Sequence, residues 1–199
     1  MGDPRLWAGV SFAEGLKMDA DDHGSNTACG EGEHSTGVEW LASRLPGFAV
    51  LPARDREAIV SFAFLWSFFE ARLMENGANA KRIAGLVDQW NAAGELDADL
   101  YDAELAYFKD RYFRHGEFTP RFGKLNLRRA DMPDLVASVI RGVNDDVRDG
   151  VLTLLLIVWR LRNNLFHGEK WAYWLEGQRD NFDHANAALI RILERHGFH

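Results

Sequence analysis

The sequence contains one cysteine, Cys29, among its 199 residues, so no disulfide can form within the chain. So little cysteine is typical of proteins of the reducing cytoplasm, where we expect this protein to act. Long hydrophobic runs are also missing, since the longest, residues 151–159, is shorter than the roughly 20 residues that cross a bilayer. We therefore expect no membrane association.

The N-terminal residues carry no recognisable targeting signal. The stretch MGDPRLWAGVSF lacks the basic and apolar segments that a signal peptide needs. A myristoylation signal requires Ser or Thr at position 6, where this chain has Leu6. The sequence predicts neither secretion nor an N-terminal lipid anchor.

Positive charge is in the minority, because 23 Lys and Arg residues face 30 Asp and Glu residues, for a formal net charge of -7. This balance argues against a protein that coats nucleic acid through bulk electrostatic attraction, although a local basic surface remains compatible with it. Hydrophobic residues make up 47% of the chain, which predicts a folded protein rather than a disordered one.

Residues 15–37 are polar, acidic and rich in glycine, and we interpret them as a mobile loop. The loop contains His23, Cys29 and His34, but their spacing matches no standard zinc motif. We therefore expect neither a metal ion nor a cofactor.

The rest of the sequence predicts helices, because apolar residues recur every three or four positions and no stretch alternates as a strand would. The predicted helices are residues 38–45, 55–77, 78–91, 97–113, 133–145, 147–168 and 178–197. Asp55 is expected to cap its helix, Gly77 to end it, and Val143 to face the core. We predict an all-α protein, an antiparallel helical bundle of residues 55–199 behind an N-terminal extension of residues 1–54.

The segment RLRNNLFHG, residues 160–168, ends the most apolar predicted helix with polar side chains. One interpretation is an ordinary helix end, because cations favour the last carbonyl groups and glycine often follows them. The other is a site that handles phosphate. Arginine can hold a phosphate through two parallel hydrogen bonds, and histidine can move a proton near neutral pH.

Two features favour the phosphate site. Polar groups at the centre of a helical protein need partners, at about 1–3 kcal/mol for each one left unpaired. Arg162 and His167 also lie five residues apart, about 140° around an ideal helix, so one straight helix would not aim both at one atom. They converge only if the helix unwinds near Asn164 or if a second copy supplies half of the site.

Residues 162–167, RNNLFH, form an R-x4-H motif with a polar residue directly after the arginine. This motif resembles that of HEPN domains, which are all-α modules of ribonucleases, toxin–antitoxin pairs and antiviral defence proteins. The aromatic and acidic stretch FLWSFFEARL, residues 64–73, is similar to the first helix of that family. The resemblance covers about residues 55–197.

The sequence departs from some members of that family. Arg160 has a looser R-x6-H spacing, but Leu161 follows it, so Arg162 is the better match. Glu169 stands where some family toxins carry a tyrosine that is a target of modification, so that regulation is not expected here.

The resemblance implies a toxin or defence ribonuclease that cleaves RNA without a metal ion. Arg162 would stabilise charge on the phosphate, His167 would move the proton of the attacking 2′-hydroxyl group, and Asn163 matches the polar position between them. Domains of this family commonly pair so that both motifs face one cleft, so a homodimer is expected. An antitoxin or other regulatory protein is a further candidate partner.

Two other features bear on the site. Glu70 follows Trp66 by one turn, either at the edge of the apolar stripe or paired with a cation, for which Arg162 is the first candidate; Asn164 is a second supporting residue. Residues 111–129, the basic segment, carry six Arg or Lys against one acid, with aromatic residues between them. Such a segment suits single-stranded RNA, although its rings can equally pack in the core while its charges are solvated. The RNA-binding candidates are Arg111, Arg114, Arg121, Lys124, Arg128 and Arg129.

Two other functions remain open from the sequence. A catalytically silent HEPN-like module that binds nucleotide, RNA or protein would share the same motif. A plain helical interaction protein would use Arg162 and His167 only to cap a helix.

Overall fold

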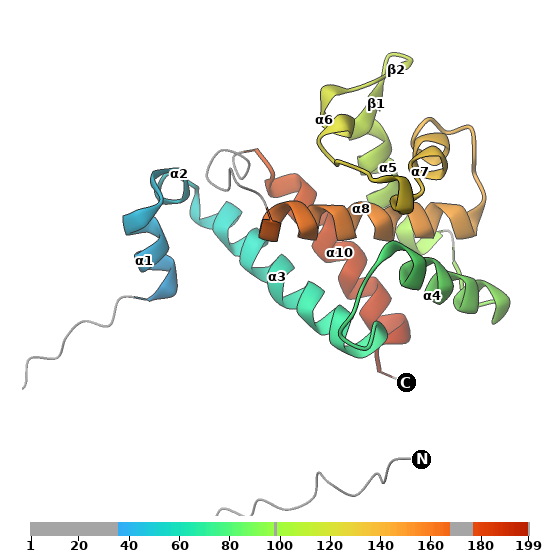
Figure 1. The fold of residues 1–199 in the computed structure, drawn as a ribbon, viewed down its shortest axis with the longest axis horizontal. Coiled ribbons are helices and arrows are strands. Elements are labelled where there is room, and N and C mark those ends of the chain that lie inside the picture. The colour runs from blue at the N-terminus through green and yellow to red at the C-terminus, as the bar shows by residue number, and fades with distance from the viewer. Residues whose placement is uncertain (1–35, 98, 168–176, 199) are drawn as a thin grey trace, which may run out of the picture. The chain divides into compact units, whose positions relative to one another are not determined.

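A computed structural model describes residues 36–97, 99–167 and 177–198 of the chain, and it is mostly helical, as predicted (Figure 1). The α-helices are α1 (Gly37–Arg44), α2 (Pro46–Ala49), α3 (Ala53–Leu73), α4 (Ala80–Ala92), α5 (Asp102–Tyr112), α6 (Pro120–Gly123), α7 (Pro133–Ile140), α8 (Val147–His167) and α10 (Arg179–His196). Two 3-10 turns, η1 (Asp99–Tyr101) and η2 (Arg129–Asp131), and two short strands, β1 (Phe113–Arg114) and β2 (Glu117–Phe118), complete the described part. The strands pair antiparallel.

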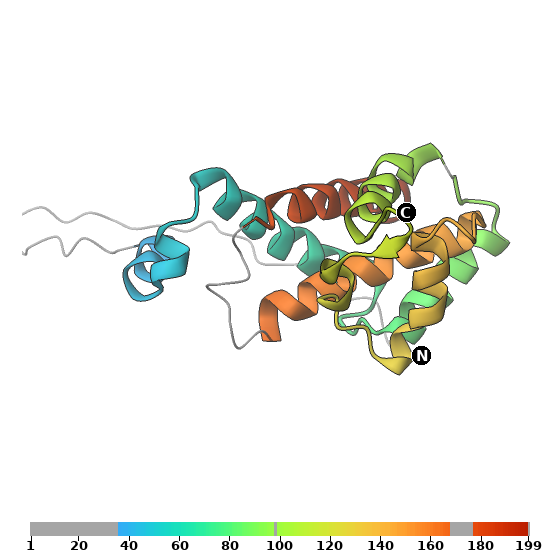
Figure 2. The ribbon, with the colours of Figure 1, turned by 90° about the horizontal axis from the view of Figure 1, so that it is seen from above.

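Helix α8 is the most buried helix, as its apolar sequence predicts. Every residue from Val151 to Val158 is buried, and seven of these eight residues are 0% exposed. The helix packs against α4, α5 and α7 and crosses α3 and α10 at an angle (Figures 1 and 2). Arg162, Asn163 and Asn164, which are partly exposed, therefore follow directly on helical turns that are fixed in the core.

Helices α3 and α10 lie side by side and run in the same direction. At one end the Asn186 side chain donates to the carbonyl oxygen of Ala58 (3.0 Å), and at the other Arg72 donates to the carbonyl oxygen of Gly197 (2.9 Å). The antiparallel arrangement predicted from short connections is wrong for this pair, because the two helices are joined by most of the chain and not by a tight loop.

Three local predictions are wrong at helix ends. Gly77 does not end α3, because the helix stops at Leu73 with Met74 as its C-cap. Asp55 lies in the first turn of α3, and the N-cap position belongs to Pro52, which offers no side-chain hydrogen bond. Val143 is 76% exposed, because α7 ends at Ile140 and the chain turns away before it. The hairpin at residues 113–118 was not predicted, because its strands have two residues each. Strands this short are too short to show an alternation of apolar and polar residues.

The predicted N-terminal extension is only partly described. Its loop, residues 15–37, lies almost wholly outside the described residues, as do the three side chains weighed as metal ligands. Farther along, Phe48 and Leu51 are buried and belong to the same core as α3. The boundary after residue 54 stays a prediction.

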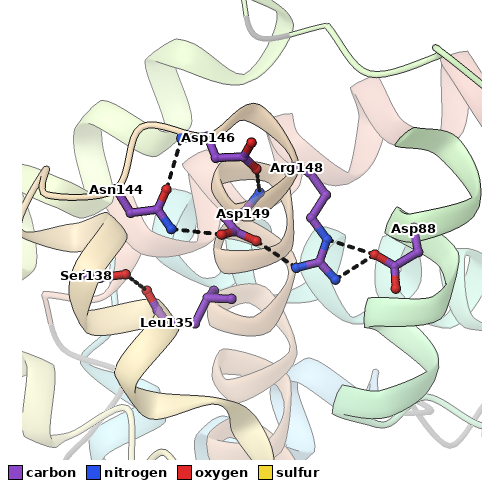
Figure 3. A network of polar contacts seen from close by, with 7 residues as sticks. All are labelled: Asp88, Leu135, Ser138, Asn144, Asp146, Arg148 and Asp149. Atoms are coloured by element: carbon purple, nitrogen blue, oxygen red, sulfur yellow. Dashed lines mark hydrogen bonds and ion pairs between the residues drawn. The ribbon is translucent and has the colours of Figure 1, made fainter. Parts of the chain in front are cut away.

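The N-terminus of α8 is held by a network of charged side chains (Figure 3). Arg148 pairs with Asp88 of α4 (2.6 Å) and with its neighbour Asp149 (2.7 Å). Asp149 also accepts a hydrogen bond from Asn144 (2.8 Å), and its backbone N–H donates to the Asp146 carboxylate (3.0 Å). The network ties α8 to α4 and to the turn that precedes α8.

The network predicts an acid-sensitive contribution to stability. Burial raises the pKa of Asp149, but the hydrogen bonds from Arg148 and Asn144 and the Arg148 charge outweigh it, so the pKa is lowered. The stabilisation is therefore complete above the pKa of an unfolded aspartate, about 3.9, and is lost as pH falls through the lower pKa of the folded state. Urea unfolding across pH should show that Asp149→Asn is less stable than wild type at pH 7 and that the difference shrinks below about pH 4.

Asp145 provides the matched control, because it is an exposed aspartate of the same turn with no side-chain hydrogen bond or ion pair among the described residues. Asp145→Asn should follow the wild-type pH curve. A difference between Asp149→Asn and wild type that stays constant down to pH 2 would contradict this account.

Candidate functional site

Arg162 extends from α8 toward α3 and is held by three contacts. Its Nη2 atom lies 3.7 Å from Oε2 of Glu70, and its Nη1 atom donates to Oδ1 of Asn163 (3.1 Å). The guanidinium group also lies over the ring of Phe166, 5.2 Å from the ring centre. The side chain remains 28% exposed, so it is oriented by protein contacts and still open to solvent.

The Glu70 side chain is held in place by two contacts besides the one with Arg162. Its Oε2 accepts a hydrogen bond from the Trp66 indole (3.0 Å), and its Oε1 accepts one from the backbone N–H of Ala78 (2.9 Å). Of the two alternatives that the sequence left open for Glu70, the pairing with Arg162 is the one present. Because both carboxylate oxygens accept hydrogen bonds from the protein, the carboxylate is held in one orientation and is suited to positioning the Arg162 guanidinium group.

Helix α8 is continuous from Val147 through His167. The unwinding near Asn164 that would bring Arg162 and His167 together in one chain is therefore absent. His167 is the last residue of α8, and its side chain lies outside the described part, as do Gly168 and Glu169. The remaining route to a joint site is a contribution from a second copy, which stays a prediction.

The opposite side of α8 is occupied by the end of the basic segment. Arg160 is 2% exposed, donates through Nε to the carbonyl oxygen of Leu125 (3.0 Å) and lies 3.5 Å from the buried carboxylate of Asp131. Burial lowers the pKa of Arg160, and the Asp131 carboxylate opposes that effect. One turn later Asn164 donates to the carbonyl oxygen of Lys124 (3.1 Å). Arg160 and Asn164 thus hold a loop, and Arg160 is not accessible to a ligand.

The aromatic residues of the basic segment pack mainly on one another. Tyr112 is 2% exposed, Phe118 stacks on Phe122 with ring centres 4.2 Å apart, and Phe113 meets Phe118 edge to face at 5.3 Å. Arg141 lies over the Phe118 ring at 5.7 Å. Most ring faces that were candidates for base stacking are therefore already covered.

The structure does not gather the RNA-binding candidates at Arg162. Arg111 donates to the Tyr107 hydroxyl (3.2 Å), and Arg114 is ion-paired with Asp110. Asn164, which bonds the basic segment, lies about 200° around an ideal helix from Arg162. The remaining candidates are exposed along the loop on that side: Arg121, Lys124, Arg128 and Arg129.

Two contributors to this region were not anticipated. Asp131 is 1% exposed, and its carboxylate caps η2 by accepting from the backbone N–H of Arg128 (2.8 Å) while facing Arg160. Asp131 left no capping-box signal in the sequence, because Arg128 at the N-cap position has no side-chain acceptor. The backbone of Ala78, which holds Glu70, left no signal in the sequence.

Comparisons with known proteins add no identification. No protein-family model, curated protein or solved structure matches the chain. Within the described residues, no three His, Cys, Asp or Glu side chains lie close enough together to hold a metal ion. None of the described helices has the length and apolar character required to cross a membrane.

Proposed function

We propose that this chain is a HEPN-type helical bundle and a metal-independent endoribonuclease of the toxin or antiviral-defence class. The observation that carries the proposal is the Glu70–Arg162 ion pair beside the R-x4-H motif. An arginine that only capped α8 would bond helix carbonyl groups, but among the described residues Arg162 contacts side chains alone. Its Nε atom is buried without a hydrogen-bond partner there, but the side chain as a whole is 28% exposed, so part of it can be reached by a phosphate from solvent.

The residues have distinct roles in the proposed reaction. The 2′-hydroxyl oxygen of RNA attacks the adjacent phosphorus, the P–O5′ bond breaks, and a 2′,3′-cyclic phosphate and a 5′-hydroxyl group form. His167 moves the proton, with His167 of a second copy in the opposite acid–base role. Arg162 stabilises the charge on the phosphate oxygens, and Asn163 and Glu70 hold its guanidinium group.

Cleavage of labelled RNA by the purified full chain in EDTA tests this proposal. Wild type should cut RNA but leave the same sequence in DNA intact, because DNA lacks the attacking hydroxyl group. The upstream product should end in a 2′,3′-cyclic phosphate. A 3′-hydroxyl end, or cleavage that requires Mg²⁺, would contradict the mechanism.

A catalytically silent module that binds nucleotide, RNA or protein is the second candidate. It is favoured by the contacts that already engage both Nη atoms of Arg162 and by the mutual packing of the rings of the basic segment. RNA binding without cleavage, lost in Arg162→Ala, would support it. A homodimer, an antitoxin or regulatory partner and a cytoplasmic location remain parts of the proposal.

A further inference from the structure

The outward face of α3 carries apolar side chains that the fold does not use. Val60, Phe64 and Phe68 follow one another at four-residue steps and are 40%, 74% and 42% exposed. Phe198, just beyond α10 and 64% exposed, lies 6.0 Å from Phe68 between ring centres. Contiguous exposed apolar side chains of this kind mark interaction surfaces. We refer to the outward positions of residues 57–72 as the α3 face.

The α3 face has nearly the same pattern in both chain directions from Phe64. Ser61 and Ser67 lie three residues to either side of it, and Val60 and Phe68 lie four residues to either side. A two-fold axis at Phe64 would set α3 antiparallel to the same helix of a second copy. Small Ser61 would then lie beside Phe68 of the partner subunit, and Ser67 beside the partner's Val60, so large side chains meet small ones.

Charges at the two ends of the α3 face are also complementary to themselves. Glu57 lies seven residues before Phe64, and Arg72 lies eight residues after it. The antiparallel arrangement places Glu57 beside Arg72 of the partner subunit, and symmetry repeats the pair at the other end. Neither side chain has an ion pair among the described residues, although Nε of Arg72 donates to the carbonyl oxygen of Gly197 (2.9 Å). The outward positions between the two residues are uncharged. Such opposite charges favour this register over a shifted one.

We propose that the α3 faces of two copies pair antiparallel about a two-fold axis at Phe64. Glu70 lies about 120° around an ideal helix from Phe64, so the pairing leaves the Glu70–Arg162 contact uncovered. The two-fold axis places the same lateral side of α3 from both copies on the same side of the helix pair. Both Arg162 sites therefore lie on one side of the dimer, away from the α10 edges. The pairing itself does not depend on the proposed ribonuclease activity.

The molecular mass of the protein in solution tests whether two copies pair through their α3 faces. By sedimentation equilibrium the full chain should be a dimer, and Phe64→Glu should raise the dimer dissociation constant by at least about 100-fold, because it buries unpaired charge at the axis. Val143→Glu is the matched control, since Val143 is 76% exposed but lies outside α3, and this variant should remain dimeric. A monomeric wild type, or a Phe64→Glu variant that keeps the dimer mass, would overturn the proposal.

Crosslinking tests the orientation. With Cys29→Ser as background, Phe64→Cys should form a disulfide-linked dimer on mild oxidation, because residue 64 meets itself at the axis. Val60→Cys should not, since the two copies of residue 60 stand about 12 Å apart along the helices. Equal crosslinking at both positions would indicate parallel pairing and overturn the antiparallel arrangement. Glu57→Arg should weaken the dimer and added Arg72→Glu should restore it, and failure of that rescue would count against the register.

Discussion

Arg162→Ala is expected to lower the rate of RNA cleavage by about 1,000-fold without unfolding the protein. The guanidinium group is 28% exposed and lies at the surface end of its helix, so its removal costs little packing. Its loss removes a charged donor at the position where charge develops on phosphate, an effect on the order of 100- to 1,000-fold for a single donor. Arg162→Lys should recover little, because a lysine ammonium group cannot present two parallel donors. Initial rates on labelled RNA in EDTA, with circular dichroism of each variant, provide the measurement.

Glu70→Gln separates positioning from chemistry. The amide cannot carry the charge that attracts Arg162, so kcat should fall by about 10- to 100-fold while the helices remain intact. The same substitution in an Arg162→Ala background should have almost no further effect, because the residue that Glu70 positions is gone. Glu75→Gln is the control, since Glu75 is 90% exposed and pairs with Arg82 away from the motif. If the Arg162→Ala variant cleaved RNA at the wild-type rate, the catalytic role proposed for Arg162 would be contradicted.

The largest expected effect on stability comes from Asp131→Ala, which should lower the free energy of unfolding by about 3–5 kcal/mol. Arg160 and Asp131 are 2% and 1% exposed and form an ion pair, so the substitution leaves a buried guanidinium group without its counter-charge. It also removes the acceptor for the backbone N–H of Arg128. Urea unfolding at pH 7 would measure the loss.

A double variant distinguishes lost pairing from lost packing. Asp131→Ala combined with Arg160→Met removes the orphaned charge and replaces it with an apolar side chain of similar length. The double variant should therefore be more stable than Asp131→Ala alone, because an apolar replacement of a buried pair costs less than breaking it. A double variant less stable than both single variants would show that the ion pair is not the main source of stability here.

Helical spacing was sufficient to predict the core side of most helices. Trp66 and Phe69 of α3, and Leu189 of α10, are buried as their three- and four-residue spacing requires. The same reasoning failed for Val143, because an apolar residue just beyond a helix end keeps the spacing without the helix. It also could not assign the direction of α10 against α3, since periodicity contains no information on which helices meet.

The candidate site, too, could be predicted from the sequence only in part. An acid on an apolar stripe either lies at its edge or has a partner, so the sequence could name Arg162 as a candidate partner of Glu70 but could not choose between the two arrangements. The fixed position of Arg160 could not be predicted, because its partners, the carbonyl oxygen of Leu125 and the Asp131 carboxylate, come from a loop of irregular structure. The basic segment was a candidate RNA surface because its sequence is rich in basic and aromatic residues. The sequence could not reveal that Phe118 and Phe122 stack on each other.

The packing of α3 against α10 also sets the timing of folding during protein synthesis. Phe62 of α3 contacts Phe182 of α10, and the intervening 120 residues take about 6 to 24 seconds to translate. Throughout that interval the core face of α3 has no permanent cover, so a nascent chain exposes it to chaperones. The packing of α3 on α10 therefore forms only after the ribosome has made α10.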